Sequence, residues 1–197
     1  MFRPISLLNS ILNIITKLLA NRLQAKILKL IHVNQYGFLK SRTIQDCVGW
    51  AYEYIHQCKQ SKQECIILKL DFAKAFDTIE HKAILQILRC KGFDDRWLGW
   101  MDCLMSSGTS AVLLNGTPGK KFACRRGVRQ GDPLSPTLFV VGSDLLQSMV
   151  NVLFREGVLR APLPIPDIDL PIVQYADDTL LILQACPNQL QALKMLL

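Results

Sequence analysis

Apolar residues recur along this chain at the spacing of amphipathic helices. In residues 8–31 they stand at positions 8, 11, 15, 18, 19, 23, 27 and 30, and Lys and Arg lie on the opposite side. A period near 3.6 residues predicts a helix. The same pattern predicts helices over residues 44–58, from His81 to Leu88 and from Trp97 to Met105, a long and largely buried helix after Pro133, and a last helix that begins near Asn188.

Shorter apolar runs predict strands between these helices. The run "CIILKL" at residues 65–70 fits a buried strand that ends at Asp71. The run "VQYADDTLLIL" at residues 173–183 fits two strands on either side of the adjacent Asp177 and Asp178. Because short strands alternate irregularly with helices, the sequence predicts an α+β fold.

Glycine, asparagine and proline mark the connections. The segment "SAVLLNGTPGKKFAC" at residues 110–124 predicts a hairpin that turns within residues 115–119. Residues 34–42, "NQYGFLKSR", predict a turn-rich connector, and residues 157–171, which hold four prolines, predict an extended one.

Composition limits the class of protein. The 197 residues are 50% hydrophobic, which is enough for one sizeable core. The seven cysteines are odd in number and form no C-x-x-C pair, which argues against a disulfide framework or a zinc site and for a reducing compartment. Lys, Arg, Asp or Asn interrupts every apolar run, so none is expected to span a bilayer. We therefore expect an intracellular protein, nuclear or cytoplasmic, that is not secreted and has no membrane partner.

The formal net charge of +7 is concentrated in part of the chain. Residues 1–45 hold no Asp or Glu, and their seven basic residues account for the whole excess: Arg3, Lys17, Arg22, Lys26, Lys29, Lys40 and Arg42. A second acid-free stretch, residues 103–131, holds Lys120, Lys121, Arg125, Arg126 and Arg129. Clustered positive charge is typical of a polyanion-binding protein, although a solvated basic face explains either cluster when taken alone.

Three aspartates fall at predicted strand ends. Asp71 ends one strand, and Asp177 and Asp178 lie at the tip of a predicted hairpin. Asp is also a common turn residue, so the pair alone fits a simple turn. If the three carboxylates converge, a cation must offset their repulsion, and hard oxygen ligands of this kind suit Mg²⁺.

Three motifs resemble those of reverse transcriptases. They are "KLDFAKAFDTIEH" at residues 69–81, "GVRQGDPLSP" at residues 127–136 and "YADD" at residues 175–178, in the order and rough spacing of that family. The resemblance is to the LINE-type, non-LTR retrotransposon enzymes, and "RPISLLNSILNIITKLLANRLQ" at residues 3–24 and "NQYGFLKSRTIQD" at residues 34–46 extend it over nearly the whole chain.

The resemblance implies a right-hand polymerase palm with partial fingers. It places the fingers at about residues 1–66 and 109–130 and the palm at about residues 67–108 and 131–197 of a single reverse transcriptase domain. It implies that Asp71 and Asp177 bind two Mg²⁺ ions, with Mn²⁺ as a substitute, that Asp178 completes the charge, and that the backbone carbonyl of Phe72 adds a ligand.

The same resemblance implies contacts with substrate. Gln130 and Gly131 would lie against the incoming nucleotide, and Arg42 and Lys40 would meet its triphosphate. Each has a simpler alternative, a turn before a helix for the first pair and solvated cations for the second. Tyr175 would line the primer end or pack under the hairpin. From the charge pattern, the nucleic acid is expected to meet Lys120, Lys121, Arg125, Arg126 and, less specifically, Arg129.

Phe76 lies five positions after Asp71, which the resemblance places close to the nucleotide sugar. RNA-templated RNA polymerases have an acid at the matching position, which accepts a hydrogen bond from the ribose 2′-OH. An aromatic ring has no such acceptor and fills the space of the hydroxyl, so Phe76 favours deoxynucleotides. The alternative is a Phe of the core.

These residues indicate an RNA-directed DNA polymerase that transfers a nucleotide from a dNTP to a primer 3′-OH, with an RNA template and a DNA primer as partners. The alternative is a catalytically inactive relic that binds nucleic acid. The chain begins inside the first fingers motif and stops within a predicted helix, so we expect a fragment, with no thumb and no endonuclease, that extends primers poorly.

Overall fold

The computed structural model describes residues 6, 8–164 and 170–197, and it is a mixed α+β structure. The chain divides into two compact units. The helical unit comprises Met1–Leu23 and Lys74–Gly142, and the sheet unit comprises Gln24–Ala73 and Ser143–Leu197. These boundaries fall at other residues than the fingers and palm boundaries predicted from sequence, which remain a prediction. Arg3 and residues 165–169 of the predicted proline-rich connector lie outside the described residues.

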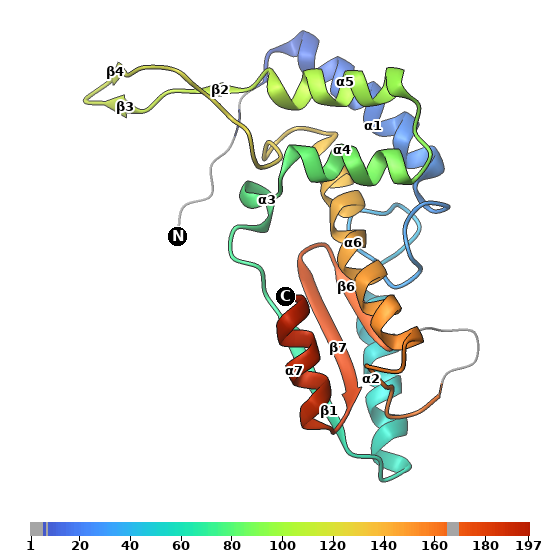
Figure 1. The fold of residues 1–197 in the computed structure, drawn as a ribbon. Coiled ribbons are helices and arrows are strands. Elements are labelled where there is room, and N and C mark those ends of the chain that lie inside the picture. Colours follow the sequence, from blue (N-terminus) through green and yellow to red (C-terminus); the bar gives the residue numbers. More distant parts are fainter. Residues whose placement is uncertain (1–5, 7, 165–169) are drawn as a thin grey trace. The chain divides into compact units, whose positions relative to one another are not determined.

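A three-stranded antiparallel sheet organises the sheet unit (Figure 1). Its strands are β1 (Cys65–Leu70), β6 (Ile172–Tyr175) and β7 (Asp178–Gln184), in the order β1-β7-β6. The strands predicted from sequence are confirmed. The expectation that β1 is buried is wrong in part, since β1 lies at the edge of the sheet and leaves Ile67 47% exposed.

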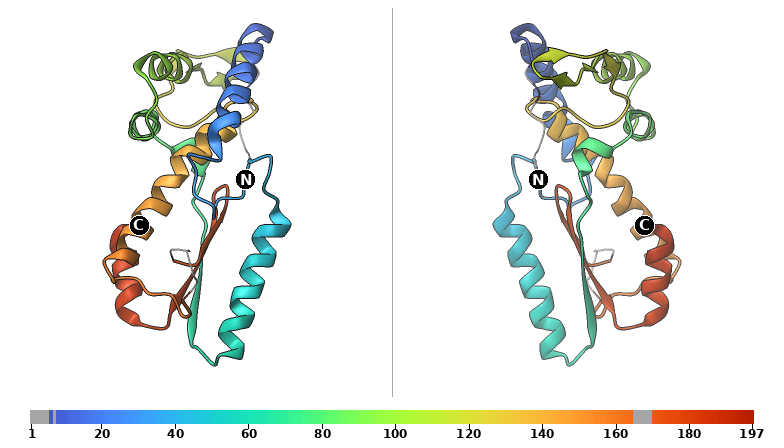
Figure 2. Two further views of the ribbon diagram at one scale, coloured as in Figure 1. Left: turned by 90° about the vertical axis from the view of Figure 1, so that its right-hand side faces the viewer. Right: turned by 90° about the vertical axis from the view of Figure 1, so that its left-hand side faces the viewer.

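Helices cover both faces of this sheet. Helix α2 (Ile44–Gln60) lies on one face, and α7 (Pro187–Leu196) lies on the other with the part of α6 that belongs to the sheet unit (Figure 2). Side chains alternate along a strand. In β7, Ile182 accordingly packs with Tyr54 of α2, whereas Leu181 and Leu183 pack with Leu193 of α7. Because both faces are covered, β7 has a continuous apolar run at residues 180–183.

The helical unit contains the N-terminal part of α1 (Ser10–Ile27), the short α3 (Ala75–Thr78), α4 (His81–Cys90), α5 (Asp95–Ser106) and the first part of α6 (Ser135–Arg155). Helices α4 and α5 lie side by side (Figure 1). The apolar stripes that predicted these two helices supply fully buried residues, among them Ile84, Leu88 and Met101. Each predicted helix is confirmed, whereas α3 is a single turn that the sequence pattern did not predict.

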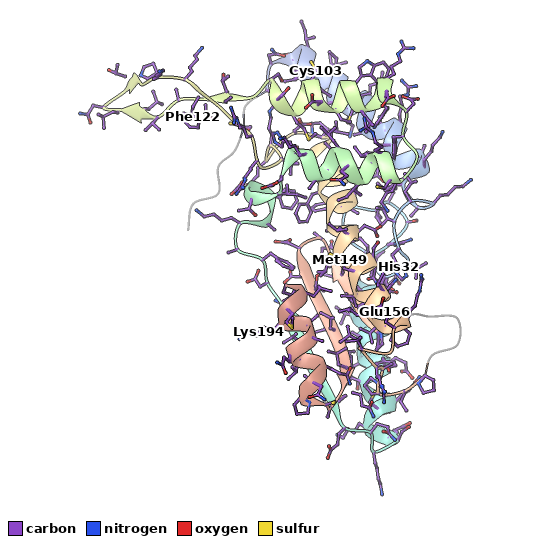
Figure 3. The ribbon with its side chains drawn as sticks, viewed as in Figure 1. His32, Cys103, Phe122, Met149, Glu156 and Lys194 are labelled. Atoms are coloured by element: carbon purple, nitrogen blue, oxygen red, sulfur yellow. The ribbon has the colours of Figure 1, made fainter. Side chains whose placement is uncertain are left out.

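A narrow arm extends from the helical unit after α5. It pairs β2 (Thr109–Ser110) with β5 (Phe122–Ala123) and β3 (Leu113–Leu114) with β4 (Thr117–Pro118). The predicted hairpin is confirmed, and its turn is Asn115-Gly116, where both residues have positive φ. Asn-Gly suits such a turn because both residues tolerate left-handed backbone. Phe122, labelled on this arm in Figure 3, is 52% exposed.

Helix α6 is long and apolar enough, by length and composition alone, to cross a membrane. This corrects the sequence expectation that no apolar run reaches that length. Half of the apolar window is buried within the protein, and the helix carries the buried polar residues Asp144, Gln147 and Asn151. Buried core helices of soluble proteins have the same length and composition, so these two properties alone do not define a membrane span.

Candidate functional site

The adjacent aspartates lie at a tight hairpin. Strands β6 and β7 pair up to Tyr175 and Asp178, so that only Ala176 and Asp177 form the turn. Ala176 is buried and adopts a left-handed backbone with φ of 59°. Asp177 is half-buried, and Asp178 is exposed. The hairpin thus keeps its apolar strands in the core and presents the two carboxylates at its tip.

Asp71 reaches the same end of the sheet from β1. The β1–β7 ladder ends with Leu70 opposite Thr179. Asp71 comes directly after Leu70 and Asp178 directly before Thr179, so both lie one position beyond this last pair. Directly opposite positions on paired strands have Cβ atoms about 5 Å apart, and these two residues are one step beyond the ladder. Strand register therefore brings Asp71 to the end of the sheet at which the β6–β7 turn lies.

A lysine faces these carboxylates. The Lys69 Nζ lies 2.9 Å from Asp178 Oδ1, with 66% and 57% of the two side chains exposed. The pKa of Lys69 is raised, chiefly by the hydrogen bond to Asp178 and by that residue's charge, and to a smaller extent by the charge of Asp71. Its ammonium group therefore offsets part of the repulsion between the two carboxylates.

The carboxylates supply the right donors for a hard cation. The oxygens of Asp71, Asp177 and Asp178 and the backbone carbonyl of the exposed Phe72 are ligands that Mg²⁺ accepts. Within the part of the chain that the structure describes, no three His, Cys, Asp or Glu side chains are grouped closely enough to hold a metal ion. The donor set thus fits Mg²⁺ chemically, and it is not arranged as a closed coordination sphere.

The connector at residues 34–42 holds Lys40 and Arg42. The Arg42 Nη1 donates to the carbonyl oxygens of His32 and Gln35, each at 2.6 Å, and burial lowers its pKa. The Arg42 side chain therefore holds together the chain segment between His32 and Arg42. Lys40 is exposed. Both lie in the sheet unit with the aspartates, as does the partly exposed Tyr175.

The remaining nucleotide residues lie in the helical unit, where two motifs are bound together. The Val128 N–H donates to the Phe76 carbonyl at 2.7 Å, and the Gly127 N–H donates to the Ile79 carbonyl at 2.8 Å. A Cβ on Gly127 would stand 2.7 Å from the Asp77 carbonyl oxygen, so only glycine permits this approach. "GVRQGDPLSP" is therefore held against the chain that follows "KLDFAK".

Gln130 is fixed by the same arrangement. Its Nε2 donates to Asp77 Oδ1 at 3.0 Å, and it is half-buried. Gly131, which follows it, has a φ of 101°, a conformation that favours glycine. Sequence reasoning identified Gln130 and Gly131 but not Asp77, whose only signal was its place inside the motif.

Phe76 stacks on Phe139 of α6, with ring centroids 4.2 Å apart and planes inclined by 12°. Phe139 is 4% exposed, whereas Phe76 is only half-buried. One side of the Phe76 ring therefore contacts the core, and part of the residue remains accessible.

The five predicted nucleic-acid contacts differ in their surroundings. Lys120, Lys121 and Arg125 are exposed on or beside the arm. Arg126 lies 2.6 Å from Glu80, and the Arg129 Nη2 donates to the Leu104 carbonyl at 2.8 Å. Arg126 and Arg129 thus have partners within the helical unit. Their charges are less available to a polyanion than those of the three exposed residues.

Comparison with known proteins identifies the family. Residues 1–197 match the family model of reverse transcriptases, described as RNA-dependent DNA polymerases. Together with the α+β fold and the paired aspartates, this match makes the chain a member of the reverse transcriptase family. It is related to the polymerases of non-LTR retrotransposons, so that the resemblance read from the motifs is confirmed.

Three relatives illustrate this placement. The chain is 30% identical to the Transposon TX1 uncharacterized 149 kDa protein of Xenopus laevis, covering 93% of this chain and 14% of that protein. It is 30% identical to the Pol polyprotein of the type-1 retrotransposable element R2 of Popillia japonica, covering 92% and 25%. It is 27% identical to the RNA-directed DNA polymerase from mobile element jockey of Drosophila melanogaster, covering 90% and 18%. The chain thus spans a quarter or less of each relative.

A solved structure shares the fold. Apo telomerase from Candida tropicalis, truncated from its C-terminal domain, matches with a TM-score of 0.59 over 94% of this chain and 36% of that chain. The identity is 15%, so the likeness concerns the fold alone.

Proposed function

We propose that this chain performs RNA-directed DNA synthesis for a non-LTR retrotransposon. The reaction joins the primer 3′ oxygen to the α-phosphorus of a dNTP, breaks the bond between the α- and β-phosphates, and releases pyrophosphate and the hydroxyl proton. An RNA template would select each dNTP by base pairing. Family membership over the whole chain supports the reaction class.

The observation that supports the proposal is the strand register, which puts Asp71 and Asp178 at the end of the sheet where the β6–β7 turn carries Asp177. Bound Mg²⁺ would stabilise the negative charge on the attacking and leaving oxygens in such a transfer. Asp71 and Asp177 would hold two ions, with Asp178 and the Phe72 carbonyl beside them. Because Lys69 pairs with Asp178, its ammonium group would have to move before an ion could take that carboxylate.

The proposal includes the substrate contacts that the sequence predicted. Lys40 is exposed and suited to the triphosphate, and Gln130, oriented by Asp77, would lie against the nucleotide. Phe76 would exclude the 2′-OH, and Tyr175 would line the primer end. The basic arm would contact the template–primer backbone.

Single-nucleotide extension tests this function. With the chain in excess over a DNA primer on an RNA template, one dNTP and Mg²⁺, no processive synthesis is required. We expect Asp177→Asn to lower the rate on the order of a thousandfold, because a neutral amide is a poor Mg²⁺ ligand. Asp102→Asn, which removes an exposed carboxylate of α5, is the matched control and should leave the rate unchanged. Equal rates in wild type and Asp177→Asn would contradict the proposal.

The second candidate is nucleic-acid binding without turnover. It is favoured by the exposed Lys120, Lys121 and Arg125 and by the lack of a closed metal cluster among the described residues. Wild-type chain that binds the template–primer but adds no nucleotide, with Mn²⁺ or with Mg²⁺, would support it.

A further inference from the structure

The predicted connector at residues 34–42 contributes to the sheet. The Tyr36 N–H donates to the Gln174 carbonyl, and the Gln174 N–H donates to the Asn34 carbonyl, each at 2.8 Å. Gln35 therefore pairs with Gln174 in parallel, on the side of β6 that faces away from β7. This pairing brings the Gln35 side chain to the hairpin that carries Asp177 and Asp178.

The side-chain amide of Gln35 binds both backbone groups of Ala176. Its Oε1 accepts from the Ala176 N–H at 3.0 Å, and its Nε2 donates to the Ala176 carbonyl at 3.4 Å. The same Oε1 accepts from the Gly37 N–H at 2.8 Å, and Nε2 also lies 3.3 Å from Ser143 Oγ. Gln35 is fully buried, so water does not compete for these bonds. Buried polar groups with complete partners hold a unique geometry.

Gly37 approaches the same turn closely. A Cβ on Gly37 would stand 2.3 Å from the Ala176 nitrogen and 2.9 Å from its Cα, distances that no side chain tolerates. The φ of Gly37 is not in the left-handed region, so the need for glycine here is the close approach rather than the backbone conformation. Ala176 is thus bound by Gln35 and pressed by Gly37.

Ala176 needs such support because its own conformation is strained. Its φ of 59° is in the left-handed region, which a residue with a Cβ adopts only when its surroundings enforce it. Ala176 immediately precedes Asp177, so its backbone dihedrals decide where the Asp177 and Asp178 carboxylates point. We infer that Gln35 and Gly37 are positioning residues for the two aspartates of the hairpin. This inference rests on the proposed function, in which those aspartates hold Mg²⁺.

The same contacts could serve stability alone. In that case removing them would destabilise the fold as any buried amide does, without a specific effect on the carboxylates. The sheet unit offers a matched comparison: Gln147 of α6 is also a buried Gln, and its Nε2 donates to Asn151 Oδ1 at 2.8 Å. Among the described residues, Gln147 makes no hydrogen bond to the hairpin. Gly49 of α2 is the matched comparison for Gly37, because a Cβ at Gly49 would meet open space.

The test uses Mn²⁺ binding by the full 197-residue chain, followed by electron paramagnetic resonance, in wild type, Gln35→Met, Gln147→Met, Gly37→Ala and Gly49→Ala. Asp177→Asn defines the part of the binding that belongs to the hairpin. We expect Gln35→Met and Gly37→Ala to weaken that part about tenfold, a change on the order of 1.4 kcal/mol. Gln147→Met and Gly49→Ala should leave it unchanged.

Amide hydrogen exchange at Ala176, measured without metal, is the second readout. It should accelerate at least about tenfold in Gln35→Met and in Gly37→Ala and stay at the wild-type rate in the two controls. This readout does not depend on the metal. If Asp177→Asn leaves Mn²⁺ binding unchanged while Ala176 exchange responds as expected, the metal role of the hairpin fails and the positioning of its backbone stands.

Two results would overturn the inference itself. One is wild-type Mn²⁺ affinity and wild-type Ala176 exchange in folded Gln35→Met. The other is an equal loss in Gln35→Met and Gln147→Met, which would show a general loss of stability. If Gln35→Met does not fold, Gly37→Ala decides alone, because it leaves the Gln35 side chain in the chain and acts through the close approach of Gly37 to Ala176.

Discussion

At the scale of single residues, Phe76 combines two properties that sequence alone left as alternatives. Its ring stacks on the buried Phe139, which is the behaviour of a core residue. It is nevertheless only half-buried, so part of the residue is accessible. The proposed exclusion of ribonucleotides therefore requires that packing against Phe139 hold the ring in place.

Replacing Phe76 by Val separates the two roles. We expect Phe76→Val to lower the free energy of unfolding by about 1–2 kcal/mol, less than for a fully buried ring, and to raise the use of ribonucleotides relative to deoxynucleotides. Urea unfolding and single-nucleotide extension with each nucleotide measure the two effects. Phe139→Leu is the comparison: it keeps the Phe76 ring but weakens the stack, so it should lower stability and raise the use of ribonucleotides less than Phe76→Val does. A ratio that does not change in Phe76→Val would assign Phe76 to the core alone.

The aspartates could be predicted from sequence, and their neighbours could not. Asp71 and the pair at Asp177 follow or divide apolar runs, so their place at strand ends is evident from the pattern. The partner of Lys69 depends on strand register across the sheet, which no local pattern specifies. The hydrogen bonds from Arg42 to the carbonyls of His32 and Gln35 could not be predicted either. The conformation of this segment depends on its contacts with distant residues.

At the scale of elements, the arm from β2 to β5 shows why its hairpin was predictable. Asn115-Gly116 is a strong local turn signal, and the register follows from a two-residue turn. The connector at residues 34–42 shows the opposite case. Its pairing partner, Gln174, is far away in the sequence, and Gln35 binds Ala176 across 141 residues. A local reading therefore identified turns there and missed the added strand pairing.

The exposed basic residues of the arm should determine salt-dependent binding. Neutralising Lys120, Lys121 and Arg125 to Gln should reduce the slope of log K against log salt concentration by about 2–3 for an RNA–DNA hybrid, since each phosphate contact contributes about 0.7–0.9. Filter binding over a salt series measures this slope. The control removes the same charge elsewhere, at the exposed Lys59, Lys62 and Lys194, and should change the slope little. Equal effects of the two triple variants would show that only net charge matters.

At the scale of the whole chain, burial of the cysteines provides a chemical test of the fold in each unit. In the sheet unit, Cys47 and Cys58 are buried, and burial raises the pKa of both thiols. In the helical unit, Cys90 and Cys103 are exposed on α4 and α5. A thiol reacts as its thiolate, so both access and the raised pKa act against the buried pair.

We therefore expect iodoacetamide to label Cys90 and Cys103 at least about tenfold faster than Cys47 and Cys58 at pH 8, as read by mass spectrometry of peptides. Urea should remove the difference, because the unfolded thiols have ordinary pKa values and equal access.

The same pKa shifts make stability depend on pH. A thiol whose pKa is raised by folding stays protonated in the folded chain and ionises first in the unfolded one, so the free energy of unfolding should fall as the pH rises above about 9. Burial also raises the pKa of Tyr54 to about 12, which acts in the same direction at higher pH. Rapid native labelling of Cys58 would contradict the packing of α2 on the sheet, whereas slow labelling of Cys90 would contradict the exposed end of α4.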